Sequence, residues 1–259
     1  MRDFYAVLTL AYRDLMKLLR DPARLISTLM FPLLFIVILG GSLQSSFGPR
    51  SSFDYLAFIF TGVFAQTMFQ SAAMGVVSLI DDRENDFSQE VFVSPISRYS
   101  IILGKIIGET LVALTQALGI LVFGVVAGVS FSFGQLVGLA WAGVVACLFG
   151  GAFGVIILSN LNNRRTADQI FPYVMLPQFF LAGVFNPIRS LPGFLDVLSR
   201  ISPMRYAVDL TRDIFYAGRA DYATTILQGP AYNLTLMTVA FLVFLVIGTF
   251  LFVRKEQNR

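Results

Sequence analysis

Residues 134–158 read GQLVGLAWAGVVACLFGGAFGVIIL, without a single charged side chain. About 20 apolar residues in a helix match the hydrocarbon thickness of a bilayer, so this run predicts a transmembrane helix. Further runs that are nearly free of charge recur at 25–44, 55–80, 106–129, 170–185 and 234–253. The sequence therefore predicts an all-α polytopic membrane protein with six transmembrane helices, whose function lies in or across a membrane.

Composition excludes several kinds of chemistry. Only 14% of residues are charged, against about 25% in ordinary soluble domains. There is no histidine, the most common general base, and the single cysteine, Cys147, cannot form a disulfide within the chain. The sequence holds no P-loop, no HExxH and no GxSxG motif, so the chain is not expected to be an enzyme by itself.

The distribution of Lys and Arg predicts the topology. Basic residues cluster before the first run, after the second and fourth runs and in the tail. By the positive-inside rule, both termini face the cytoplasm and the chain crosses the cell's inner (plasma) membrane several times. The segment 187–233 would be external and yet holds five arginines. We expect it to be structured and charge-paired, with Arg205 bonded to Asp209 and Asp209 to Arg212.

Residues 4–20 predict an amphipathic helix. Phe4, Leu8, Ala11, Leu15, Leu18 and Leu19 share one face, and Arg13, Lys17 and Arg20 lie opposite. This pattern favours a helix lying in the membrane interface over an ordinary surface helix packed on protein. Asp21-Pro22 predicts the start of the first span, and Pro32 inside that span predicts a kink. The charged segment ahead favours a true span over a secretory signal.

The loop at 81–99 carries five carboxylates and a short predicted helix that Ser94-Pro95 ends. This helix is too short to cover its own apolar side chains, Phe87, Val91 and Phe92. Uncovered apolar side chains indicate a docking element rather than a merely solvated loop. Ser202-Pro203 predicts the start of a helix at about 203–216. That helix and a shorter one before it are expected to form an external lid or re-entrant hairpin.

Two local features inside the spans indicate helix packing or ion pairing rather than a functional site. Glycines four apart, at 104/108, 124/128, 134/138 and 150/154, predict close helix packing. Glu109 is the only acidic residue well inside a span. An intramembrane ionisable group is a functional candidate, but Lys105 one turn earlier favours a helix-end ion pair.

Two motifs carry a family resemblance. The first reads RE at 83–84, SPISR at 94–98 and LGK at 103–105; the second reads LAGVF at 181–185, LPGFL at 191–195 and SPMRYA at 202–207, followed by Arg212. Together with the order of the predicted helices they resemble the permease subunit of an ABC-2 type exporter, although Asp86 stands where that family usually has glycine. The resemblance covers the whole chain. It implies a homodimer in contact with membrane lipid, with a separate ABC ATPase in a 2:2 complex, and no nucleic acid.

The resemblance also assigns residues. It implies that the chain binds no cofactor and that ATP and Mg lie on the partner ATPase. ATPase coupling is expected at Arg83, Glu84, Phe87, Glu90, Val91 and Phe92. The substrate path is expected at the dimer interface, at Phe31, Gln66, Phe69, Gln70, Tyr173, Gln178 and Phe179. The external lid is expected to include Pro192, Gly193, Pro203, Arg205, Asp209 and Arg212.

The predicted organisation is one transmembrane domain over 1–259. It is divided into an interfacial helix (1–23), spans one and two (24–80), a coupling loop (81–99), spans three to five (100–186), external helices (187–233), and span six with the tail (234–259). The expected function is export of an amphipathic drug-like or lipid-like substrate. Flipping of a lipid-linked glycan is the alternative within the class. A secondary transporter or channel, which would work alone under an ion gradient, and an intramembrane enzyme are rivals from other classes.

Overall fold

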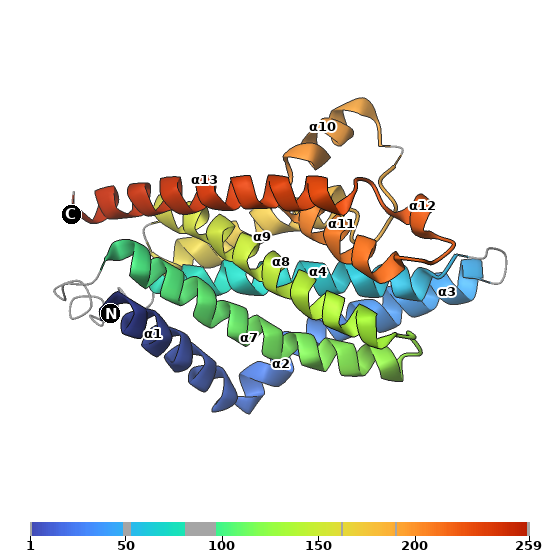
Figure 1. The fold of residues 1–259 in the computed structure, drawn as a ribbon, viewed down its shortest axis with the longest axis horizontal. Coiled ribbons are helices and arrows are strands. Elements are labelled where there is room, and N and C mark those ends of the chain that lie inside the picture. Colours follow the sequence, from blue (N-terminus) through green and yellow to red (C-terminus); the bar gives the residue numbers. More distant parts are fainter. Residues whose placement is uncertain (1, 49–52, 81–96, 162, 190, 258–259) are drawn as a thin grey trace.

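The computed structural model describes residues 2–48, 53–80, 97–161, 163–189 and 191–257, and over these residues it contains helices and no strand. The helices are α1 (Arg2–Leu19), α2 (Pro22–Phe35), the π-helix η1 (Ile36–Gly40), α3 (Gly41–Phe47), α4 (Tyr55–Val77), α7 (Arg98–Val126), α8 (Phe133–Asn160), α9 (Arg164–Leu181), α10 (Gly193–Ile201), α11 (Pro203–Tyr216), α12 (Tyr222–Thr225) and α13 (Pro230–Gln257). The long helices form an elongated bundle (Figure 1). The prediction of an all-α protein is confirmed.

Among the described residues, five stretches are long and apolar enough to cross a membrane: 25–47, 55–77, 99–126, 133–160 and 222–254. The expected fifth span, 170–185, is not among them. Its helix, α9, has 18 residues and begins with Arg164, Arg165 and Asp168 in the first turns. It ends at Leu181, because Gly183 adopts a left-handed φ of 72°. The apolar part that remains is shorter than the roughly 20 residues that match a bilayer.

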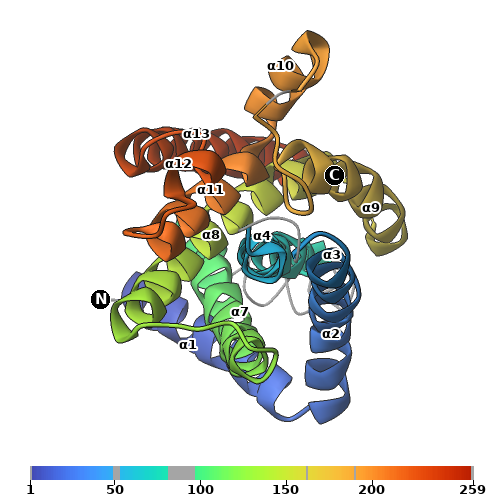
Figure 2. The ribbon, with the colours of Figure 1, turned by 90° about the vertical axis from the view of Figure 1, so that its right-hand side faces the viewer.

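The helix α4 occupies the centre of the bundle, as the view along the long axis shows (Figure 2). It is buried almost throughout. Its closest neighbour is α8, where the predicted glycine pair at 150 and 154 faces α4. A Cβ at Gly150 would lie 2.1 Å from the carbonyl oxygen of Phe69, and one at Gly154 would lie 2.4 Å from that of Ala73. Only glycine lets these two backbones touch, as in other small-residue helix contacts in membranes.

The N-terminal helix α1 packs along α7 and keeps an apolar face uncovered. Ala11, Asp14 and Leu18 are buried, whereas Phe4 and Tyr12 are each 64% exposed. The predicted amphipathic helix is therefore confirmed, and one side of it is a protein contact. Asp21-Pro22 separates it from α2, which begins at Pro22 as predicted.

The first span is interrupted rather than straight. Pro32 lies inside α2, and the backbone widens into the π-helix Ile36–Gly40 one turn later. Proline cannot donate the helical hydrogen bond, and π-turns are a usual site of helix irregularity. The predicted distortion near Pro32 therefore takes the form of a wider turn.

The segment before α13 holds three short helices with different surroundings. The helix α11 starts at Pro203 after Ser202, as predicted, and packs against α4, α8 and α13. In contrast, α10 stands away from the bundle in both views (Figures 1 and 2). Its apolar side chains Phe194 and Ile201 are 69% and 71% exposed. Thus α11, the charged helix, is buried, whereas α10, the amphipathic helix, is exposed.

The contact between α4 and α8 can be tested with two alanine substitutions in one helix. Gly150→Ala should lower the free energy of unfolding by about 1–3 kcal/mol, because its Cβ meets backbone that cannot move aside. Gly134→Ala is the matched control, since nothing lies within 4 Å of a Cβ there. Thermal unfolding in detergent measures both. Equal melting temperatures for the two variants would contradict the close backbone contact.

Candidate functional site

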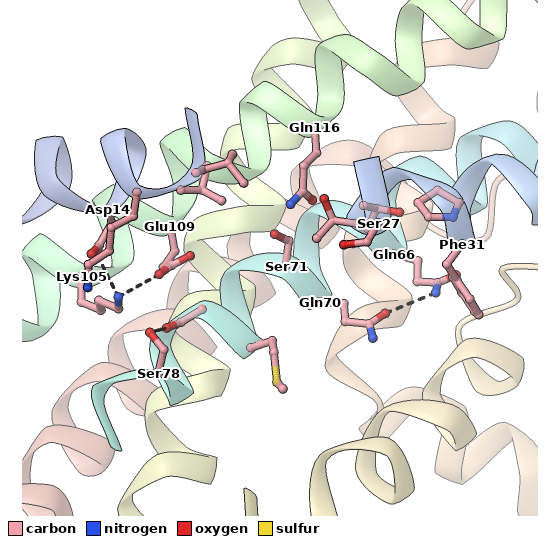
Figure 3. A pocket seen from close by; sticks show the side chains of 18 of the residues that line it. Asp14, Ser27, Phe31, Gln66, Gln70, Ser71, Ser78, Lys105, Glu109 and Gln116 are labelled. Atoms are coloured by element: carbon pink, nitrogen blue, oxygen red, sulfur yellow. Dashed lines mark hydrogen bonds and ion pairs between the residues drawn. The ribbon is translucent and has the colours of Figure 1, made fainter. Parts of the chain in front are cut away.

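A polar cavity of about 580 Å³ lies between α1, α2, α4 and α7 (Figure 3). It runs from a charged end near α1 to an amide end near α2. Its lining combines charged, amide and hydroxyl side chains with a few apolar ones. The lining residues are Asp14, Lys17, Leu18, Ser27, Thr28, Phe31, Pro32, Gln66, Thr67, Gln70, Ser71, Met74, Gly75, Ser78, Lys105, Glu109, Val112, Gln116 and Arg164.

A buried ion cluster forms the charged end. The Lys105 ammonium group lies 2.9 Å from a Glu109 oxygen, as predicted, and 2.8 Å from an oxygen of Asp14. All three side chains are at most 5% exposed. Arg13 binds the other Asp14 oxygen at 3.0 Å, so two cations balance two carboxylates. Buried charges persist only when paired in this way.

Asp14 was missed by the sequence reasoning, although a signal for it exists. It lies three residues after Ala11 and four before Leu18, so it shares the apolar face of the helix. A carboxylate on such a face must meet a buried cation. Local spacing predicted the pair of Lys105 with Glu109, but not the third member from a helix 91 residues away.

The carboxylate of Glu109 lies directly against the backbone of α4. A Cβ at Gly75 would come within 2.0 Å of its oxygen. This glycine makes room for the charge between α7 and α4. The cluster therefore ties three helices together at one end of the cavity.

Amide and hydroxyl groups form the other end. Gln66 and Gln70 lie one turn apart on α4, and the Gln66 amide nitrogen donates to the Gln70 oxygen at 3.4 Å (Figure 3). Gln116 on α7 and Ser27 on α2 face the same space. Phe31 stands beside Gln66 and is 47% exposed. This end can hydrogen-bond a polar group and contact an apolar one.

The structure brings together three of the seven expected path residues, namely Phe31, Gln66 and Gln70. The other four lie elsewhere in the subunit. Phe69 is buried between Phe149 and Phe153, whereas Tyr173 on α9 is 82% exposed. The Gln178 oxygen accepts from the backbone nitrogen of Met204 and the hydroxyl of Ser202, each at 3.4 Å, which fixes the start of α11. Phe179 is buried beside Phe185.

A ladder of aromatic rings leads away from the amide end. Phe31 contacts Phe35 at 4.3 Å between ring centroids, and Phe35 stacks on Phe185 at 5.1 Å. Phe180 and Phe179 lie 6.0 and 6.4 Å from Phe185. These separations are typical of favourable aromatic pairs. The ladder joins the cavity to the segment after α9.

On α11, the two predicted charge pairs are replaced by other partners. The Asp209 oxygens accept from the backbone nitrogens of Leu227 and Gln228 at 2.8 and 2.9 Å and from the amide of Asn233 at 2.8 Å. Arg205 donates to Ser199 at 2.7 Å and lies 3.6 Å from Asp196. The prediction of bonded pairs within the helix was wrong, because chain segments packed against α11 offer closer partners than the next turn does, although the charges of Asp209 and Arg212 still attract each other.

Arg212 joins α11 to the N-terminal end of α4 and to the turn after α9. It is 3% exposed. Its terminal nitrogen donates to the carbonyls of Gly183 at 2.8 Å, Val184 at 3.2 Å and Phe58 at 3.3 Å, and its guanidinium lies 3.6 Å from the centroid of the Phe58 ring. Burial lowers the pKa of Arg212 to about 10, so it stays protonated at neutral pH. Burial also raises the pKa of Asp209, against the opposing effect of its hydrogen bonds.

The remaining expected site residues fall into two groups. Pro203 is the first residue of α11, and Pro192 and Gly193 begin α10. The six expected coupling residues, between 83 and 92, lie outside the described residues. Their assignment stays a prediction.

The ion cluster can be tested by removing its shared cation. Lys105→Met should lower the free energy of unfolding by about 3–5 kcal/mol, because the buried Glu109 carboxylate would lose its cation and the buried Asp14 carboxylate would be left with Arg13. Adding Asp14→Asn and Glu109→Gln to Lys105→Met should recover most of the lost free energy of unfolding. Arg200→Met is the control, because it breaks an exposed pair with Asp196 and should cost about 0.5 kcal/mol or less. Chemical denaturation in mixed micelles compares the variants, and equal losses would contradict the cluster's role.

The role of Arg212 can be tested by hydrogen exchange. Arg212→Lys should speed exchange at the amides of Gly183 and Val184 by at least about tenfold, because an ammonium group cannot reproduce the planar contact with three carbonyls. Arg219→Lys is the control, since the Arg219 side chain donates to the exposed carbonyl of Ser130 and lies over the ring of Phe215. Unchanged exchange at 183–184 would show that the turn is held by other contacts.

These features define a multi-pass α-helical membrane protein with a polar cavity inside its bundle. Residues 5–216 match the family model described as ABC-2 type transporter. The chain therefore belongs to the ABC-2 type transporter family.

Two relatives with similar sequences carry permease names, and a third carries the name of a nodulation protein. A transport permease named ycf38, from Cyanophora paradoxa, is 22% identical over 94% of this chain and 86% of its own length. YbhR from Escherichia coli, named a multidrug ABC transporter permease, is 28% identical over 54% of this chain and 38% of its own length. Nodulation protein J from Rhizobium meliloti is 24% identical over 74% of both chains. The family and the names of the first two relatives agree on a transport permease.

Proposed function

We propose that this chain is the permease subunit of an ATP-driven exporter that moves an amphipathic, drug-like or lipid-like molecule out of the cytoplasm or the inner leaflet. This proposal rests on the polar cavity, whose amide end adjoins the aromatic ladder. A headgroup requires hydrogen bonds, and an apolar chain requires apolar contacts. The Gln66–Gln70 pair and the rings of Phe31 and Phe35 supply both within one subunit.

ATP hydrolysis is assigned to a separate ABC ATPase, which also holds the ATP and Mg. The chain lacks the GxxxxGK[ST] loop that cradles nucleotide phosphates. Membership in the family supports such a partner. The coupling residues expected between Arg83 and Phe92 would dock into it.

We further propose a homodimer in a 2:2 complex. The exposed faces of α2 and α9 support it, because they present large apolar side chains, including Leu34, Tyr173 and Phe180, without a covering element among the described residues. Tyr173 would then face the substrate path from the dimer interface. The same faces would otherwise contact lipid.

Both termini are proposed to be cytoplasmic, because Lys and Arg concentrate in the segments on that side. The start of α1 and the end of α13 lie at the same end of the bundle (Figure 1), as an even number of crossings requires. In this proposal α9 is the fifth of six crossings, and α10 and α11 form the external re-entrant segment.

The proposed coupling can be tested with two substitutions. Phe87→Ala should weaken binding of the ATPase by about tenfold or more, because burying a large apolar side chain contributes roughly 1.5–3 kcal/mol. Glu84→Ala should leave assembly largely intact but lower transport per ATP hydrolysed, because Glu84 is expected at the join between span two and the predicted docking helix. Pull-down of the ATPase and transport in proteoliposomes measure the two effects.

The matched control is Phe133→Ala. Phe133 is 83% exposed at the start of α8, outside the segment in which the docking helix is expected. ATP hydrolysis by the purified chain alone, or transport by it under an ion gradient without any ATPase, would refute the split-subunit proposal. Wild-type behaviour of both loop variants would move the coupling to another segment, with α1 the next candidate.

A further inference from the structure

We propose that the cavity between α1, α2, α4 and α7 is a headgroup site within one subunit and that it selects an uncharged, hydroxyl-rich headgroup. This inference rests on the export function proposed above and deepens it. Three observations on the cavity wall carry it: the direction of its hydroxyl groups, an unsatisfied amide oxygen, and the internal pairing of its charges.

Three of the five hydroxyl groups in the cavity lining present acceptors. Thr28 donates its proton to the carbonyl of Leu25 at 2.9 Å, and Thr67 to that of Val63 at 2.8 Å. Ser78 donates to the carbonyl of Gly75 at 2.7 Å. A hydroxyl that has donated its proton keeps its oxygen lone pairs to accept. A ligand rich in donors therefore fits this wall.

The amide pair adds an acceptor that lacks a partner and a donor. Gln66 is 1% exposed, and its side-chain oxygen has no hydrogen-bond partner among the described residues. An unsatisfied buried acceptor is unfavourable, and a ligand hydroxyl that donates to it would remove this penalty. The Gln70 oxygen is taken by Gln66, which leaves the Gln70 nitrogen to donate toward the cavity. A hydroxyl group can do both, because it donates and accepts.

The charges of the wall favour neither a cationic nor an anionic headgroup. The lining contains three cationic and two anionic side chains. Lys105 is bonded to both carboxylates, Arg164 is bonded to Asp168 at 2.8 Å, and the third cation, Lys17, also interacts with a neighbouring group. A cation would face a surplus of positive charge, and an anion would have to displace these existing pairs. A polyhydroxyl group requires neither.

Binding of three probes that share one fluorescent hexyl tail tests this proposal. Their headgroups are a maltoside, a trimethylammonium and a phosphate, and fluorescence anisotropy reports their binding to the full chain in phosphatidylcholine nanodiscs. The maltoside should bind most tightly. Gln66→Leu and Gln70→Leu should each weaken maltoside binding by about fivefold, the effect of one neutral hydrogen bond, and leave the other probes unchanged.

Gln169→Leu is the matched control, because this exposed glutamine on α9 lies outside the cavity lining. Tightest binding of the phosphate or the trimethylammonium probe would overturn the proposal. So would maltoside binding that neither cavity variant changes. ATP-driven transport with the ATPase is measured separately: its absence beside amide-dependent maltoside binding would refute export but leave the headgroup site standing.

Discussion

Gly150 and Gly154 bring the backbone of α8 into contact with that of α4, and the other helices are arranged around this pair. In a bilayer, lipid chains are as apolar as leucine, so helices gain little from burying apolar surface against one another. Close packing and satisfied polar groups must hold the bundle instead. The glycine contact supplies the first of these, and it places α4 where every polar side chain on it faces protein or the cavity.

The second requirement is met at the two ends of α4. At one end, the ion cluster of Asp14, Lys105 and Glu109 joins α1 and α7 to α4. At the other end, Arg212 donates to carbonyls of α4 and of the turn after α9. In each case a buried charge joins segments that are distant in the sequence. Removing one partner leaves the other unsatisfied in a medium of low polarity, so these links are specific.

The cavity and the aromatic ladder occupy the space between these two anchored ends. This arrangement gives one subunit a polar site that continues into an apolar track, which is the contact pattern an amphipathic molecule requires. The interrupted first span supplies Phe31 and Phe35, and the wide turn at Ile36–Gly40 follows directly after them.

The sequence by itself determined the class of the protein, the positions of five spans, the starts of α2 and α11, the Lys105–Glu109 pair and the glycine contact of α8. Each follows from hydropathy or from spacing within one helix, which are local properties. Only the tertiary structure decided that Asp14 completes the ion cluster, that Asp209 and Arg212 bond to distant backbone, and that Phe31, Gln66 and Gln70 share a cavity whereas Phe69 and Gln178 do not. A buried polar group bonds to whichever partner the packing brings nearest, and residues far apart in the sequence supply that partner.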